Sequence, residues 1–116
     1  MKIVNRIKDS KDFAITIKQG KTAKNQSYVL HFVKTDSDHT RIGISVSKKI
    51  GNAVTRNRVK RQIRAMLDSL INYNLNKFDV VVIARQDFLN KNFDENKLLL
   101  SDLLLNQVGI KNEEEK

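Results

Sequence analysis

KKIGNAVTRNRVKRQIR, residues 48–64, is the stretch around which the fold of this 116-residue chain is organised. It contains seven cations and neither Asp nor Glu. Gly51 and Asn52 predict the start of a helix, because an Asn side-chain oxygen at the N-cap accepts a hydrogen bond from an amide of the first turn. We expect this helix to continue to about Asn72.

A helical period places the apolar residues of this segment within one arc, which predicts a face buried in a core. The residues of this arc are Val59, Ile63, Met66, Leu67, Leu70 and Ile71. Arg58 and Arg61 point away from it. Lys60 and Arg64 lie on one flank, and Arg56 lies near its edge in the first turn. One helix is therefore expected to be buried on one side and cationic on the other.

A solvated surface is the ordinary explanation of a charged helix face. Within residues 48–64 no acid relieves the like-charge repulsion, which costs about 0.2–0.5 kcal/mol per pair four residues apart. Arg also outnumbers Lys on the helix, and its planar guanidinium suits bidentate contact with phosphate. These features favour RNA or DNA binding over a solvated face.

The length of the chain predicts a single domain, and its charge also favours a nucleic-acid partner. A chain of this length forms one domain that buries about two-thirds of its unfolded surface. The net charge of +9 favours a polyanionic partner, with an acidic membrane surface as the weaker alternative. Residues 1–64 carry sixteen cations against four acids, a balance of +12, whereas residues 65–116 carry six against nine, a balance of −3. The first half is expected to build the binding face.

The absence of Cys excludes a disulfide-linked partner, a thiolate zinc site and a Cys nucleophile. With His31 and His39 as the only imidazoles, we expect no metal site built from protein imidazoles. The chain has no apolar signal segment and no apolar run near eighteen residues, so we expect no membrane span. These features predict a soluble, cytoplasmic protein.

Before the organising helix, residues 1–9 are expected to form a basic arm, flexible like the tail at residues 111–116. Ser10 is a candidate N-cap for a short helix that ends at Gly20 and carries Phe13 and Ile17 on one face. Residues 18–26 are expected to form a basic linker.

Strands are expected at residues 28–33, 41–46 and 79–84. The first alternates, with Tyr28, Leu30 and Phe32 on one face and His31 on the other. A polar hairpin loop at residues 35–40 joins it to the second. There Gly43 indicates either close approach of a ligand or backbone, or a bulge.

The third strand is apolar throughout, which predicts a central strand. Asp94 is expected to cap a last helix whose leucines, Leu98, Leu99, Leu100, Leu103, Leu104 and Leu105, lie against the sheet. The predicted fold is α+β, a two-layer α/β sandwich with the order α-β-β-α-β-α.

No catalytic constellation is found. Asp36, Asp38 and His39 lie in the predicted loop, where turn-forming side chains are the default explanation. Asp79 and Asp94 are interpreted as turn and cap residues. Among the aromatics, Phe32 fits the core, whereas Phe13 fits the core and a base-stacking platform equally well. His31 fits either a polar groove or a satisfied core position.

GISVSKKIGNAVTRNRVKRQIR, residues 43–64, resembles the signature region of the protein subunit of bacterial ribonuclease P. The segment Arg56-Asn57-Arg58, with Lys60, Arg61 and Arg64, carries the resemblance. Segments 5–13, 26–32 and 79–85 match the family in order and spacing, so that the resemblance covers residues 5–86.

The resemblance implies a protein that joins a catalytic RNA subunit and assists removal of the 5′ leader from precursor tRNA. The RNA would carry the active site and its Mg²⁺ ions, so that no catalytic or metal-binding residue is expected on the protein. It also implies a left-handed crossover through the basic helix, a rare hand. The expected RNA-binding residues are Lys48, Lys49, Asn52, Arg56, Asn57, Arg58, Lys60, Arg61 and Arg64.

A cleft lined by Phe13, Ile17 and His31 would hold the single-stranded leader. Where the family often has a second aromatic and a Tyr, this chain has Ile17 and His31, which predicts weaker stacking on the leader. The alternative is a structural RNA-binding protein of ribosomal type without leader recognition. A stand-alone nuclease is a further alternative, and it would require protein carboxylates or a His base.

Overall fold

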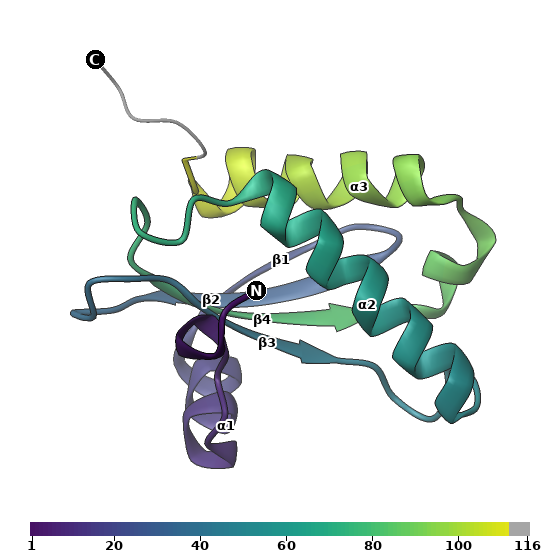
Figure 1. The fold of residues 1–116 in the computed structure, drawn as a ribbon, viewed down its shortest axis with the longest axis horizontal. Helices are drawn as coiled ribbons and strands as arrows, with labels where there is room; N and C mark the ends of the chain where they lie inside the picture. Colours follow the sequence, from purple (N-terminus) through teal and green to yellow (C-terminus); the bar gives the residue numbers. More distant parts are fainter. Residues whose placement is uncertain (112–116) are drawn as a thin grey trace.

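The structure, a computed structural model, describes residues 1–111 as a four-stranded sheet with helices on both faces (Figure 1). The rest of the predicted tail, residues 112–116, lies outside the described residues. In chain order the helices and strands are η1 (Ile3–Asn5), α1 (Ser10–Gln19), β1 (Lys21–Lys24), β2 (Tyr28–Lys34), β3 (Arg41–Ser45), α2 (Ala53–Leu70), β4 (Phe78–Ala84), η2 (Gln86–Asn90), α3 (Phe93–Asp102) and η3 (Leu103–Val108).

The strands are arranged in the order β1-β2-β4-β3. β4 is antiparallel to β2 and parallel to β3, which confirms it as a central strand. Two predictions are wrong. Residues 21–24 form a strand rather than part of a linker, and the loop at residues 35–40 is not a hairpin, because β4 lies between β2 and β3. β1 is a short edge strand with three polar residues, so its sequence lacks the apolar alternation that marks a strand.

β3 and β4 are neighbouring parallel strands that are connected through α2. The left hand of this connection stays a prediction. The observed order includes the additional strand β1, so the predicted order α-β-β-α-β-α is incomplete.

The main core lies between one face of the sheet and the pair α2 and α3. Tyr28 and Leu30 of β2 and Val80 and Val82 of β4 are fully buried in it. From α2 come the side chains that the helical period predicted: Val59, Ile63, Met66 and Leu67 are all buried, and Ile71 follows at the end of the helix. Burial of each large apolar side chain contributes roughly 1.5–3 kcal/mol, so this face holds α2 firmly on the sheet.

The last helix has a narrower buried face than expected. Leu100, Leu103 and Leu104 are buried, but Leu98 is 72% exposed and Leu105 is 44% exposed. α1 lies on the opposite face of the sheet from α3 (Figure 1). The predicted two-layer sandwich therefore describes the main core, to which α1 adds a partial layer.

Helix starts follow the predicted cap in one case out of three. Asn52 caps α2, since its side chain accepts a hydrogen bond from the Thr55 amide. α1 is capped by Asp9 rather than Ser10. α3 is capped by Asn92 rather than Asp94, because Asn92 and Glu95 have the spacing of a reciprocal capping box.

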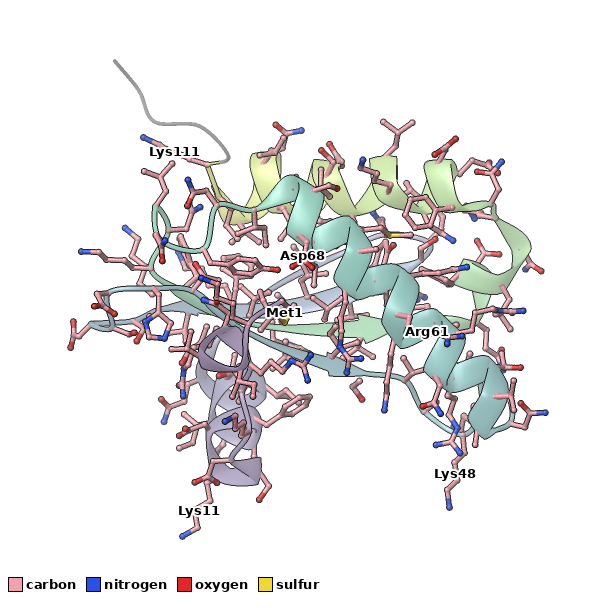
Figure 2. The ribbon with its side chains drawn as sticks, viewed as in Figure 1. Met1, Lys11, Lys48, Arg61, Asp68 and Lys111 are labelled. Atoms are coloured by element: carbon pink, nitrogen blue, oxygen red, sulfur yellow. The ribbon has the colours of Figure 1, made fainter. Side chains whose placement is uncertain are left out.

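The amino-terminal arm packs against the domain, contrary to the expected flexible segment. Asn5 and Ile7 are buried. The Ile7 amide donates to the Ile42 carbonyl, and the Asn5 side chain donates to the Thr40 carbonyl. The amino group of Met1 lies 2.7 Å from Asp68 on α2 (Figure 2).

Candidate nucleic-acid interface

The cations of the segment from Lys48 to Arg64 form one surface, which we call the cationic ridge. Arg58 and Arg61 are exposed, and Arg61 lies on the side of α2 away from the sheet (Figure 2). Arg56 is half-buried, as its place near the edge of the apolar arc predicted. The full ridge consists of Lys48, Lys49, Arg56, Arg58, Lys60, Arg61 and Arg64.

The ridge has a fixed base. Ile50 is buried just before the Asn52 cap, and Val59 and Ile63 are fully buried beneath the cations. The Gln86 side chain, which follows β4, donates to the Lys49 carbonyl at 3.1 Å. The polar residues Asn52 and Asn57 are exposed on the same segment. The ridge is therefore held by the core and by the first residue of η2, while the side chains of Arg58 and Arg61 face solvent.

No carboxylate within residues 1–111 forms an ion pair with any cation of the ridge. Arg56, Lys60 and Arg64 follow one another at four-residue spacing, so their charges repel along one row. The Nε of Arg56 is buried and has no hydrogen-bond partner among the described residues. The free charges and the repulsion together make the ridge a surface suited to a polyanion.

On the other face of the sheet, Phe13 of α1 covers Gly43 of β3. A Cβ atom at Gly43 would lie 2.4 Å from Cε2 of Phe13, so a larger residue here would require this ring to move. Gly43 pairs in regular register with Val81, and the predicted bulge is absent there. The space at Gly43 is occupied by a side chain of the same chain.

α1 is tied to the sheet by three charged residues, Asp12, Arg41 and Asp79, which we call the Arg41 cluster. Nε and Nη2 of Arg41 donate to the two carboxylate oxygens of Asp79 at 3.0 and 2.7 Å. Nη1 donates to Asp12 of α1 at 3.2 Å. The hydrogen bonds that Arg41 donates to the Asp79 carboxylate raise the pKa of Arg41, so that this guanidinium remains charged.

Asp79 was interpreted as a turn residue, which is wrong. It lies within β4, and its side chain is 11% exposed. The pair with Arg41 was missed because it depends on β3 lying beside β4. Arg41 and Asp79 are 38 residues apart in the chain but opposite each other in the parallel register.

The three residues predicted to line a leader cleft lie on the α1 side of the sheet. Phe13 and Ile17 lie one turn apart on α1, with Phe13 half-buried and Ile17 37% exposed. His31 is half-buried and alternates with the core residues Leu30 and Phe32, which places it on the opposite face from them. Its Nδ1 is 3.1 Å from Oγ1 of Thr22 on β1. We call this surface the α1 face.

Outside the ridge and the α1 face, few side chains of the described residues could bind a metal ion or catalyse a reaction. Across residues 1–111, no three His, Asp or Glu side chains are grouped closely enough to hold a metal ion. His39 pairs with Asp38 and Ser37 within the loop at residues 35–40, as expected for turn-forming side chains. In the same part of the chain, no helix is long and apolar enough to cross a membrane.

A helix that begins with a cationic segment free of acids and packs on a four-stranded sheet in an α+β fold is typical of a small basic nucleic-acid-binding protein. Comparison with known proteins gives the family. The family model for ribonuclease P matches residues 1–107. The Ribonuclease P protein component of Streptococcus pyogenes serotype M12 is 46% identical over 95 residues, which are 82% of this chain and 79% of that relative. The chain belongs to the ribonuclease P protein family, as the resemblance of residues 43–64 predicted.

Solved structures agree with this assignment. A Staphylococcus aureus RNase P protein, described as a mutant with defective mRNA degradation activity, has a TM-score of 0.81 and 35% identity. The comparison covers 93% of this chain and 91% of that one. The RNase P protein from Thermotoga maritima has a TM-score of 0.74 and 33% identity, over 85% of this chain and 94% of that one.

Proposed function

We propose that this chain binds the catalytic RNA subunit of ribonuclease P and the 5′ leader of precursor tRNA, and thereby assists endonucleolytic removal of the leader. The observation that carries the proposal is the cationic ridge, whose seven charges have no acidic partner within residues 1–111. Membership of the ribonuclease P protein family supplies the class of partner, an RNA of the tRNA-processing holoenzyme.

In this proposal the ridge contacts the phosphates of the RNA subunit. Cations that neutralise phosphates release condensed counterions, which makes binding strong at low salt and weak at high salt. Arg56, Arg58 and Arg61 contribute bidentate contacts, because a guanidinium offers two parallel donors to two phosphate oxygens. The rigid base of α2 lets the charges meet the RNA without reordering the backbone.

The leader binds at the α1 face. A single strand is held by stacking of its bases on aromatic and apolar side chains more than by its phosphates. Phe13 supplies an aromatic ring, while Ile17 and His31 supply smaller surfaces. The ridge and the α1 face lie on different elements, so the RNA subunit and the leader occupy separate parts of the protein.

The RNA subunit carries the chemistry, and Mg²⁺ belongs to the RNA subunit and the substrate rather than to a protein cage. The ridge assists indirectly, because its positive charge lowers the repulsion between RNA segments that Mg²⁺ would otherwise have to screen. We expect the assembled particle in the cytoplasm.

Cleavage of precursor tRNA at low Mg²⁺ with the cognate RNA subunit tests the proposal. We expect Arg56→Ala with Arg58→Ala to abolish most of the cleavage, and added Mg²⁺ to restore part of it. The matched control is Lys34→Ala with Lys77→Ala, which removes the same charge from exposed positions outside the ridge. Equal loss in both double variants would show that net charge alone matters and would contradict the proposal.

Leader recognition needs its own measurement, since a structural RNA-binding protein of ribosomal type would also use the ridge. The affinities of the reconstituted complex for precursor and mature tRNA are compared. We expect tighter binding of the precursor, and a smaller difference after Phe13→Ala. Equal affinity of the wild-type complex for both tRNAs would favour the ribosomal-type alternative.

A further inference from the structure

A pocket of about 180 Å³ lies between α2 and the segment that leads into α3. It is separate from the α1 face, because its lining comes from α2, η2 and α3. Val59 and Phe88 are buried and form its inner wall, whereas the other residues reach the surface. The lining residues that matter here are Arg58, Val59, Gln62, Phe88, Leu89 and Phe93.

Two apolar side chains lie exposed at the rim of this pocket. Phe93 is 39% exposed and Leu89 is 42% exposed. Residues 1–111 contain all seven aromatic residues of the chain, and Phe93 is the most exposed of them. An aromatic ring beside a cationic surface is a typical stacking platform for a nucleobase.

Two polar side chains of the pocket, Arg58 and Gln62, are free. Arg58 forms no hydrogen bond or ion pair with any described residue, and the half-buried Gln62 side chain forms none either. Lys91, at the rim, is already paired with Asp87 at 2.5 Å. A free amide offers both a donor and an acceptor, which is what the edge of a base requires.

The charges around the pocket set the direction of approach. Asp94 and Glu95 lie in the first turn of α3, next to Phe93, and would repel phosphate there. Arg58 and Arg61 lie one turn apart on α2 and carry no acidic partner within the described part of the chain. A nucleotide therefore enters with its phosphate on the α2 side and its base toward α3.

We propose that this pocket binds one unpaired nucleobase of the RNA that covers the cationic ridge. The face of this base stacks on Phe93, and its edge forms hydrogen bonds with the Gln62 side chain. The adjoining phosphate contacts Arg58 and Arg61. The inference rests on the proposed function, which supplies the RNA. It adds a base-binding site to a ridge that otherwise contacts only phosphates, and phosphate contacts alone do not fix which nucleotide lies where.

The first test is the affinity for the cognate RNA subunit. Because stacking of one base contributes about 1–3 kcal/mol, we expect Phe93→Ala to weaken binding by about 5- to 100-fold. Phe93→Leu keeps apolar bulk but has no π face, so it should lose most of the same factor. The matched control is Leu98→Ala, at an exposed position of the same helix outside the pocket, which should leave affinity unchanged. The slope of affinity against salt should stay constant in Phe93→Leu but fall by about 0.7–0.9 in Arg58→Ala.

The second test follows the base itself. The chain contains no Trp, so Phe93→Trp places a single indole in the pocket. We expect near-native affinity and a change in indole emission when the RNA subunit binds, with no change in the control Leu98→Trp. Thermal unfolding of each variant shows whether it is folded. If Phe93→Ala is unfolded, the emission of Phe93→Trp tests by itself whether RNA contacts the pocket.

The outcomes separate the two proposals. Full affinity in Phe93→Ala and unchanged emission in Phe93→Trp, together with a loss in Arg58→Ala, would overturn the pocket and leave the proposed function intact. Equal losses in the Phe93 and Leu98 variants would also overturn it, because the effect would then belong to α3 as a whole. Absence of salt-dependent binding by the wild-type protein would overturn both.

Discussion

The cationic ridge and the Arg41 cluster use arginine in opposite ways. On the ridge, seven cations lie within seventeen residues and none has a carboxylate partner in the described part of the chain. Beneath α1, Arg41 donates to Asp79 and to Asp12, and all three charges are used inside the protein. An arginine whose charge is satisfied internally positions other elements, whereas an unsatisfied one is available to a partner.

Charge reversal on the ridge should have the largest effect. Arg61→Glu with Arg64→Glu replaces two phosphate contacts by two repulsions, and we expect affinity for the RNA subunit to fall more than 100-fold. The free energy of unfolding should change little, because two repulsive pairs on α2 become attractive while the pair of position 64 with Asp68 becomes repulsive. Binding at several salt concentrations and denaturant unfolding measure the two quantities. A large loss of stability would show that these arginines serve the fold and would remove the contrast with Arg41.

Loss of Arg41 should show the reverse pattern. Arg41→Met leaves Asp79 nearly buried without its partner, and we expect the free energy of unfolding to fall by about 2 kcal/mol. Affinity for the RNA subunit should remain, but the preference for precursor over mature tRNA should weaken, since α1 loses its link to the sheet.

The double variant Arg41→Met with Asp79→Leu sharpens this test. Replacing both charges of a buried pair by apolar groups is often neutral for stability, so the free energy of unfolding should return to near the wild-type value. The link to Asp12 is still missing, and leader preference should stay weak. Recovery of both properties would show that Arg41 acts on stability alone.

A smaller effect is expected at Gly43. In Gly43→Ala the new methyl group overlaps the Phe13 ring, which must move because its nearest atom would be 2.4 Å away. Overpacking of this kind costs about 1 kcal/mol or more. Denaturant unfolding should show this loss, and leader preference should change while binding to the RNA subunit does not. Unchanged leader preference would separate Phe13 from leader binding.

The smallest expected effect is an increase in affinity for precursor tRNA. Ile17→Phe introduces an aromatic side chain one turn after Phe13, at a position that is 37% exposed. Stacking at the low end of its usual range would tighten precursor binding by up to about fivefold. Ile17→Leu is the matched control, with similar apolar bulk and no ring. An equal gain in both variants would indicate apolar contact rather than stacking.

Sequence reasoning was most successful where the signal lies within one segment. The buried face of α2, the Asn52 cap and the alternation of Tyr28, Leu30 and Phe32 are confirmed. It failed at β1, whose polar residues carry no strand signal. It also failed at the starts of α1 and α3, where a neighbouring side chain makes the cap.

Phe93 was missed for a different reason. In the sequence it is one phenylalanine at the start of a helix, and an apolar residue there is ordinarily expected in the core. Only the packing of η2 and α3 beside α2 leaves its ring exposed next to Arg58. An interpretation of Phe93 as part of a binding surface therefore requires the tertiary structure.

The sequence by itself determined a basic amphipathic helix, its apolar underside, the central apolar strand and a surplus of positive charge in the first half of the chain. Helical and strand periodicities are properties of neighbouring residues, so they can be read without knowing what lies across the sheet. Only the tertiary structure decided the strand order, the pairing of Arg41 with Asp79 and the pocket beside Arg58. Each of these depends on residues far apart in the chain, whose contacts form only when the whole set of buried side chains packs together.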